Sequence, residues 1–368
     1  MRIPGGVSSH IADLAKALTD AGHRCLILSP SERFHSPLWK AVALFKGGSV
    51  DAGRLALTQM RLANLGRRIS RAAESGSFSV VHAHDVFAAR VAQCTRLPLV
   101  LTVHGPLSKE IRMLMGKRSP RYLGYAQESE TVAYAGARRI IAVDSGQRDT
   151  IVQEYGVDPR KIHVIANAVD TDLFVPFSTP LSERRYLLVP RRLVKKNGVD
   201  VAIRAFALVD DKQIELWIAG DGPEEPHLRN LVRQLRLSDR VRFLGPVCQR
   251  TKMATLVAQA RAVLIPSVPV EGVVEATSIA ALEAMSCGVP VFASRVGGLT
   301  EIIEDGETGF LFEAGNWEEL GSLLKNALCD TDTLATVGRA ARAYVQANHS
   351  LPGWVSRVIS VYEEAIRG

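Results

Sequence analysis

Two glutamates, Glu275 and Glu283, stand eight positions apart in the segment 275-EATSIAALEAM-285. The residues between them are mostly small or aliphatic, which is typical of a helix that packs into a core. A buried carboxylate costs free energy unless it is paired or well hydrogen-bonded. The pattern therefore leaves two interpretations: either both acids face a polar ligand, or the helix is less buried than its composition indicates.

The residues that follow Glu275 can form an anion site. Glu275 lies in the loop after the strand-like run 262–267, and either Thr277 or Ser278 can begin the helix, with Ile279 in its first turn. Free backbone N–H groups of a first helical turn bind anions such as a diphosphate. Carboxylates in turn suit vicinal hydroxyls, because one carboxylate can accept two hydrogen bonds. The alternative interpretation is a pair of surface acids, favoured by the helix dipole.

Cations that could neutralise such an anion occur in 190-PRRLVKKNGV-199. The guanidinium of Arg192 is well shaped for a bidentate contact with a phosphate. Lys196 is a second candidate cation, with Arg191 as a further one. A solvated loop at the end of a strand is the alternative interpretation of this cluster.

Glycines mark two further candidate contacts with a ligand. Gly5 and Gly6 would let the backbone approach a ligand such as a phosphate closely, although they could equally be glycines at the entry of a helix. Gly220, Asp221 and Gly222 form a turn at the end of a strand-like run, where glycine permits tight backbone geometry.

Histidine and cysteine are the remaining residues that could do chemistry. His104 ends the strand-like run 98–105 and could donate a hydrogen bond to a hydroxyl. His82 and His84 have a spacing that metal ligands can use, but no third ligand cluster accompanies them, so we expect no metal. The five cysteines are scattered and lack CxxC spacing, which is typical of reduced thiols in a cytosolic protein.

The elements that must position these residues follow a repeating pattern. Short β-branched runs alternate with longer amphipathic segments, as in parallel α/β units. In the first half a helix is predicted over 7–23, and the strand-like runs are 24–29, 79–84, 98–105, 139–144 and 161–167. In the second half the runs are 186–193, 214–222, 240–246, 262–267, 289–294 and 309–314. Helices are predicted there over 199–209, 224–236, 316–329, 332–348 and 352–368.

The periodicity fails at 175–185, where proline, serine and charge take over, and we place the linker there. We predict one Rossmann-like domain over 1–175, a second over 176–351, and a final helix over 352–368 that packs back on the first domain. The chain opens at 1-MRIPGGVSSH-10, inside the turn that normally follows a first strand. We therefore expect the first strand to be missing from this sequence, through a misassigned start or a truncation.

Composition restricts the partners. The 368 residues carry 45 Lys and Arg against 38 Asp and Glu, a net charge of +7 without a dense basic tract, so nucleic acid is not expected. No apolar run approaches the length of a membrane span, and we expect a cytoplasmic protein. The basic segment 54–72 indicates either a helix that lies on an anionic membrane face or an ordinary surface helix.

At this point the motifs resemble a known family, the GT-B-fold retaining glycosyltransferases of family 4 (glycosyl transferases group 1). The resemblance covers nearly the whole chain. The matching segments are 5-GGVSSHIADLAKAL-18, 82-HAHD-85, 101-LTVHG-105, 165-IANAVDTDLF-174, 191-RRLVKKNGVD-200, 219-AGDGPE-224, 240-RVRFLG-245, 275-EATSIAALEAMSCGVPV-291 and 297-GGLTEIIEDGETGFL-311.

The resemblance implies two Rossmann-like domains and transfer of a sugar from a UDP- or GDP-sugar to an acceptor hydroxyl, without a metal or other cofactor. The acceptor would be a glycan, a lipid-linked saccharide or a small molecule. The resemblance also implies that Glu275 binds the hydroxyls of the donor sugar, Glu283 binds those of the ribose, and Arg192 binds the diphosphate. His104 would lie near the reacting sugar, and the turn 220–222 would border the base.

Three positions depart from the family pattern: Asn197 replaces a usual lysine, and Ala276 and Ala168 replace usual glycines. They leave open a catalytically inactive protein that acts as a partner or scaffold. A sugar-nucleotide epimerase shares the architecture, but the glutamate pair argues against it. A dinucleotide dehydrogenase is disfavoured, because no GxGxxG motif follows a strand with a distal acid.

Overall fold

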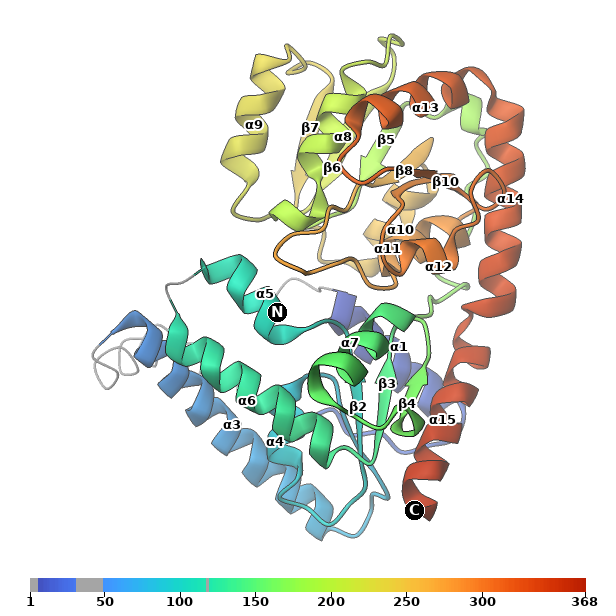
Figure 1. Cartoon of the computed structure of the whole chain (residues 1–368). Coiled ribbons are helices and arrows are strands. Elements are labelled where there is room, and N and C mark those ends of the chain that lie inside the picture. The colour runs from blue at the N-terminus through green and yellow to red at the C-terminus, as the bar shows by residue number, and fades with distance from the viewer. Residues whose placement is uncertain (1–5, 31–48, 117–118) are drawn as a thin grey trace. The chain divides into compact units, whose positions relative to one another are not determined.

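The computed structural model describes residues 6–30, 49–116 and 119–368, and it divides into two compact units, each built on one parallel sheet (Figure 1). Unit 1 comprises Met1–Asp13, Asn167–Val270 and Val274–Trp354. Unit 2 comprises Leu14–Ala166, Glu271–Val273 and Val355–Gly368. Two helices, α1 (Gly6–Asp20) and α15 (Leu351–Arg367), therefore contribute residues to both units.

Unit 1 contains a six-stranded sheet in the order β10-β9-β8-β5-β6-β7, with every neighbouring pair parallel. Its strands are β5 (Tyr186–Val189), β6 (Glu215–Ala219), β7 (Val241–Gly245), β8 (Ala262–Ile265), β9 (Val291–Ser294) and β10 (Phe310–Phe312). Its helices are α8 (Val199–Phe206), α9 (Glu225–Gln234), α10 (Arg250–Ala258), α11 (Ile279–Ser286), α12 (Leu299–Ile302), α13 (Trp317–Cys329) and α14 (Thr331–Asn348). Strands β5, β8 and β9 are buried along their whole length, as expected for a parallel sheet covered on both faces.

Unit 2 contains a four-stranded parallel sheet in the order β1-β2-β3-β4. Its strands are β1 (Val81–Ala83), β2 (Leu99–Val103), β3 (Arg139–Ala142) and β4 (Ile162–Val164). Its helices are α3 (Val50–Glu74), α4 (Val86–Ala92), α5 (Leu107–Met115), α6 (Pro120–Gly136) and α7 (Ser145–Tyr155). Helices α3, α4 and α6 pack against one another (Figure 1). The prediction of two parallel α/β units is confirmed.

The strand predicted over 24–29 is wrong. Residues 24–30 have no strand assignment, and Leu26 and Ile27 are 52% and 58% exposed. A run of β-branched and aliphatic residues becomes a strand only when a neighbouring strand takes up its backbone N–H and C=O groups. Among the described residues no strand pairs with this segment, and β1 is the outermost strand at its end of the sheet.

The other predicted elements are found within a few residues of their predicted ends, and every strand except β9, which ends at Ser294 as predicted, ends earlier than its predicted run. Strand β2 ends at Val103 and β6 at Ala219, so His104 and the turn 220–222 lie in loops at strand carboxyl ends. Within the described ranges, no helix combines the length and the apolar character that crossing a membrane requires.

Candidate active site

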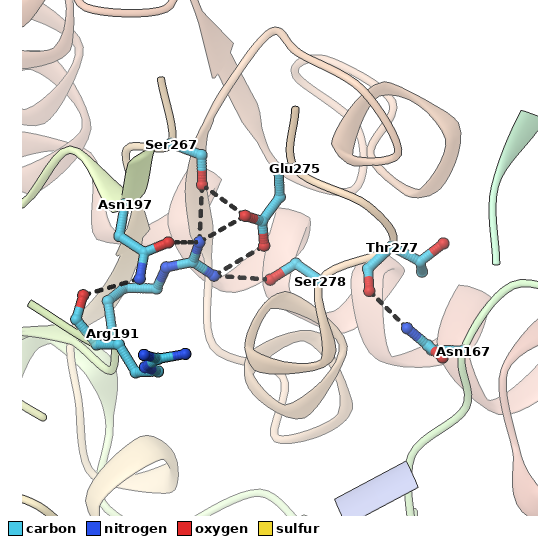
Figure 2. Close-up of polar contacts among 8 residues, drawn as sticks. Asn167, Arg191, Asn197, Ser267, Glu275, Thr277 and Ser278 are labelled. Carbon is cyan, nitrogen blue, oxygen red and sulfur yellow. Dashed lines mark hydrogen bonds and ion pairs between the residues drawn. The ribbon is translucent and has the colours of Figure 1, made fainter. Parts of the chain in front are cut away.

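Glu275 lies in the loop between β8 and α11 and is held by Arg191, which follows β5 (Figure 2). The guanidinium of Arg191 donates from Nη1 to Oε1 of Glu275 at 2.9 Å and from Nη2 to Oε2 at 2.7 Å. The two side chains are 9% and 12% exposed. A bidentate pair this buried fixes both groups, because a guanidinium and a carboxylate match in plane and spacing. This contact explains how an acid can occupy a buried loop.

Three neutral side chains complete the environment of Arg191 (Figure 2). Its Nη2 also donates to Oδ1 of Asn197 at 2.7 Å and to Oγ of Ser267 at 2.9 Å, and its Nη1 lies 3.3 Å from Oγ of Ser278. Asn197 in turn donates from Nδ2 to the carbonyl of Arg192 at 2.8 Å. Arg191 is therefore the partner of Glu275, and its use as a further cation for a diphosphate stays a prediction.

The carboxylate of Glu275 is held in its charged form. Burial by itself would raise the pKa of Glu275, but the charge and hydrogen bonds of Arg191 outweigh burial, and Lys196 and Ser267 add to their effect. The pKa therefore lies below its ordinary value of 4.5. An ionised carboxylate is a hydrogen-bond acceptor only, so Glu275 is suited to ligand groups that donate.

Glu283 lies in the middle of α11 and has a different environment. It is 9% exposed, and within the described part of the chain no hydrogen bond to its carboxyl group is found. Burial raises its pKa to about 8, although the positive charge of Arg250 partly opposes this shift. Arg250 itself makes a bidentate ion pair with Asp13, at 2.5 and 2.9 Å, and Asp13 is 2% exposed.

Arg192 and Lys196 remain as candidate phosphate cations. Arg192 is exposed, and no hydrogen bond or ion pair of its guanidinium is found among the described residues. Lys196 is half-buried and close enough to Glu275 to lower the pKa of that carboxyl group. Adjacent residues thus take different roles: Arg191 turns inward to a carboxylate, and Arg192 stays in solvent.

The two glycines of the turn 220–222 lie where the neighbouring backbone leaves no room for a Cβ atom. A Cβ on Gly220 would lie 2.0 Å from the carbonyl oxygen of Arg191, and one on Gly222 would lie 2.2 Å from that of Leu193. The carbonyl of Asp221 accepts a hydrogen bond from the backbone N–H of Leu193 at 2.8 Å. These glycines therefore let the turn pack on the loop that carries Arg191 and Arg192.

A second glycine pair supports the Glu275 loop. A Cβ on Gly297 would lie 2.1 Å from the carbonyl oxygen of Glu275, and one on Gly298 would lie 2.6 Å from the backbone nitrogen of Thr277. The N–H of Gly298 donates to the carbonyl of Glu275 at 3.1 Å. Within the described residues the Gly298 N–H therefore already has an acceptor in the Glu275 loop.

The start of α11 is confirmed at Ser278, which is its N-cap, with Ile279 as the first helical residue. The hydroxyl of Ser278 does not cap the helix and contacts Arg191 instead. Thr277 and Ser278 are 4% and 3% exposed. A Cβ on Gly6, at the start of α1, would lie 3.7 Å from Cδ1 of Ile279, an ordinary contact distance. Gly5 lies outside the described residues.

Sequence reasoning missed Asn167 as part of this site. Its Nδ2 donates to the carbonyl of Thr277 at 2.7 Å (Figure 2). Its Oδ1 lies 2.8 Å from Nδ1 of His10. Its own carbonyl lies 2.9 Å from Nδ1 of His349. Burial lowers the pKa of His10 to about 4, so this imidazole is neutral. The available signal was a polar residue inside the buried run 165-IANAV-169.

In unit 2, His104 follows β2 and is half-buried. Its Nε2 lies 3.4 Å from Nδ1 of His84, which follows β1. His82 is held between the hydroxyls of Tyr362 and Thr102, both at 2.7 Å. His82 therefore packs within its unit, whereas His84 and His104 stand together at the carboxyl ends of neighbouring strands.

Comparison with known proteins agrees with this architecture. Residues 4–173 match the model described as Glycosyltransferase Family 4, and residues 174–344 match the one described as Glycosyl transferases group 1. The chain belongs to the family 4 glycosyltransferases. Its fold is accordingly GT-B, and it is a glycosyltransferase enzyme.

Two curated relatives illustrate the range of similarity. A D-inositol 3-phosphate glycosyltransferase of Kribbella flavida is 28% identical, with 93% of this chain and 87% of the relative covered. An MMP alpha-(1->4)-mannosyltransferase of Mycolicibacterium hassiacum is 29% identical, with 80% and 72% covered. Among solved structures, Anabaena Alr3699/HepE in complex with UDP and glucose has a TM-score of 0.74 at 22% identity, with 98% of this chain and 96% of that chain covered. The solved structure shares the fold.

Proposed function

We infer that this glycosyltransferase moves a sugar from a UDP- or GDP-sugar to an acceptor hydroxyl, and that the anomeric configuration is retained. The observation that carries this proposal is the ionised Glu275 carboxylate, held by Arg191 immediately before the start of α11. A fixed acceptor for sugar hydroxyls thus stands beside a helix N-terminus that favours a diphosphate. Family membership and the solved complex of a fold neighbour with UDP support the same donor class.

In this proposal the two glutamates bind different parts of the donor. Glu275 accepts hydrogen bonds from hydroxyls of the transferred sugar, and Glu283 accepts them from the ribose. Gly220, Asp221 and Gly222 border the base. Because both carboxylates lie in unit 1, the donor would be held mainly by the second half of the chain, 176–351.

Stabilisation of the leaving diphosphate falls to Arg192, to Lys196 and to the backbone N–H groups near Ile279, without a metal. These groups are positive where negative charge develops as the bond between sugar and phosphate breaks. The acceptor oxygen attacks from the face that the phosphate leaves, and the leaving phosphate oxygen takes the acceptor proton. This course needs no covalent nucleophile.

The acceptor side of the proposal concerns the first half of the chain. Gly5, Gly6 and His104 would contact the acceptor or the reacting sugar, with 1–175 as the acceptor-binding domain and 352–368 packed on it. The acceptor would be a saccharide or a lipid-linked saccharide. In α3 the apolar residues Leu65 and Ile69 pack into the core of unit 2 while Arg67 and Arg71 are exposed, so a contact of this helix with an anionic membrane face would be electrostatic.

The test is thermal unfolding with UDP, GDP, ADP and CDP, followed by product analysis with the sugar conjugates of the nucleotide that binds. A ligand at a hundred times its Kd adds about 2.7 kcal/mol of stability. We expect this shift with UDP or GDP and its loss in Glu283→Ala. The exposed Glu307→Ala is the matched control and should keep the shift. A folded protein that no nucleotide stabilises would contradict the proposal.

A further inference from the structure

We propose that Arg191 is a positioning residue for the transfer reaction, and that Asn197 is the side chain that lets its guanidinium lie beside Glu275. This inference rests on the proposed function, because Glu275 is the carboxylate that would receive the sugar hydroxyls. Arg191 acts through Glu275 and is not itself a ligand of the donor.

The contacts show how tightly the guanidinium is defined. Nη1 and Nη2 together reach both oxygens of Glu275, and the remaining acceptors are the neutral groups of Asn197, Ser267 and Ser278. Glu275 is therefore the one ionised side chain that these bonds reach. A buried charge requires such a partner, and removing one member of the pair leaves the other uncompensated.

Asn197 fits this arrangement because its side-chain amide both accepts and donates a hydrogen bond. Its Oδ1 accepts from Arg191 at 2.7 Å while its Nδ2 donates to the Arg192 carbonyl at 2.8 Å. Asn197 is only 6% exposed. The stem of a lysine at this position would start in the same buried space, and its ammonium would compete with Arg191 for one carboxylate. Arg191 and a cation at position 197 are thus mutually unfavourable neighbours.

The pair leaves Glu275 able to bind a ligand. Its Oε1 accepts the N–H of Arg191, and its Oε2 accepts a second N–H together with the hydroxyl of Ser267 at 3.2 Å. Each carboxylate oxygen can accept two hydrogen bonds, so Oε1 keeps capacity for a hydroxyl donor. Arg191 thereby fixes the direction in which Glu275 can accept.

The experiment is a double-mutant cycle in the full chain. It compares wild type, Arg191→Gln, Asn197→Lys and the variant that carries both substitutions. Thermal unfolding without ligand is measured first. The Kd for UDP and GDP, and kcat and KM for release of nucleotide from UDP-glucose and GDP-mannose, follow. We expect Arg191→Gln to lower kcat about a hundredfold, with the nucleotide Kd changed by less than about threefold. Asn197→Lys alone should lower both kcat and Tm, and the double variant should recover at least about tenfold in kcat over Asn197→Lys.

The matched control is Arg184→Gln. Arg184 is also a buried arginine, but it donates to the backbone carbonyls of Thr179, Ala260 and Phe177. This variant should lower Tm and leave kcat unchanged well below the Tm. The proposal is overturned if Arg191→Gln changes kcat no more than Arg184→Gln does, or if the effects of the two substitutions on Tm and kcat simply add.

Failure of the proposed function would look different. In that case the wild-type chain would neither bind UDP or GDP nor release nucleotide from either donor. The Tm values of the four proteins are measured without ligand. They would still decide whether the effects of substituting Arg191 and Asn197 depend on each other. Additive changes in Tm would then reject the pairing independently.

Discussion

The surroundings of Glu275 and of Glu283 differ sharply, although the two glutamates belong to one motif and both are buried. Arg191 contacts both oxygens of Glu275 and keeps its pKa below the ordinary value. Glu283 lies near an arginine that is already paired with Asp13, and burial raises its pKa to about 8. The first acid is charged at neutral pH, and the second is mostly protonated in the absence of ligand.

The difference comes from partners that are remote in sequence. Arg191 precedes Glu275 by 84 positions, and Arg250 is shared with Asp13 across 237 positions. An ionised acid is ready to accept hydroxyl hydrogen bonds, whereas a protonated acid must first lose its proton or donate one. The two halves of the motif should therefore respond differently to substitution and to pH.

The largest effect is expected for Glu275→Gln. It leaves the Arg191 guanidinium buried without a counter-charge, which should cost about 3 kcal/mol of unfolding free energy. Loss of the fixed acceptor should lower kcat by at least about a hundredfold. Denaturant unfolding and steady-state turnover measure the two effects, with the exposed Glu307→Gln as the control. Unchanged stability would show that the ion pair with Arg191 contributes little.

The sequence predicts most of the fold, because helices and strands follow local patterns, and it supplies candidate site residues whose roles stay predictions. Apolar runs such as 262–267 and 289–294 mark buried strands, and the quoted motifs place Glu275, Arg192 and the turn 220–222 at strand ends. The strand predicted over 24–29 is wrong because strand formation also needs a neighbour, which a local pattern cannot report.

The roles of neighbouring arginines could not be predicted from the sequence. Arg191 and Arg192 are adjacent and chemically identical, and only the three-dimensional placement of Glu275, Ser267 and Asn197 turns the first one inward. By the family pattern, Asn197 is a departure that leaves open a catalytically inactive protein. The structure gives it a definite contact, since its Oδ1 accepts from the Arg191 guanidinium.

A pH-dependent effect of intermediate size is expected at Glu283. Its pKa rises from 4.5, the ordinary value for an unfolded chain, to about 8 in the folded protein. The folded state therefore keeps the Glu283 proton more tightly than the unfolded chain does. The free energy that this proton contributes to stability is fully present below about pH 4.5 and is lost as the pH rises through about 8. Glu283→Gln mimics the protonated form and should be more stable than wild type by roughly 3 kcal/mol at pH 7.

Nucleotide binding gives the second measurement at Glu283. If the ionised carboxylate receives the ribose hydroxyls, the affinity of wild type for UDP or GDP should rise about tenfold between pH 7 and pH 9. The affinity of Glu283→Gln should be lower and nearly constant over this range. Parallel pH profiles for the two proteins would mean that Glu283 does not change its ionisation on binding. The two glutamates would then differ less in how their ligand binding depends on pH.

The smallest effect is expected for Ser267→Ala, which removes one neutral support from the Glu275 region. The hydroxyl of Ser267 accepts from Arg191 at 2.9 Å and lies 3.2 Å from Oε2 of Glu275, so two hydrogen bonds lose a partner while the ion pair remains. We expect a loss of about 1 kcal/mol in unfolding free energy and a decrease in kcat of about threefold. Ser294→Ala is a suitable control, because the Ser294 hydroxyl is buried without a hydrogen bond in the described residues and its removal should cost little. A loss for Ser267→Ala as large as that for Glu275→Gln would mean that the hydroxyl, and not the pairing of charges, orients the carboxylate.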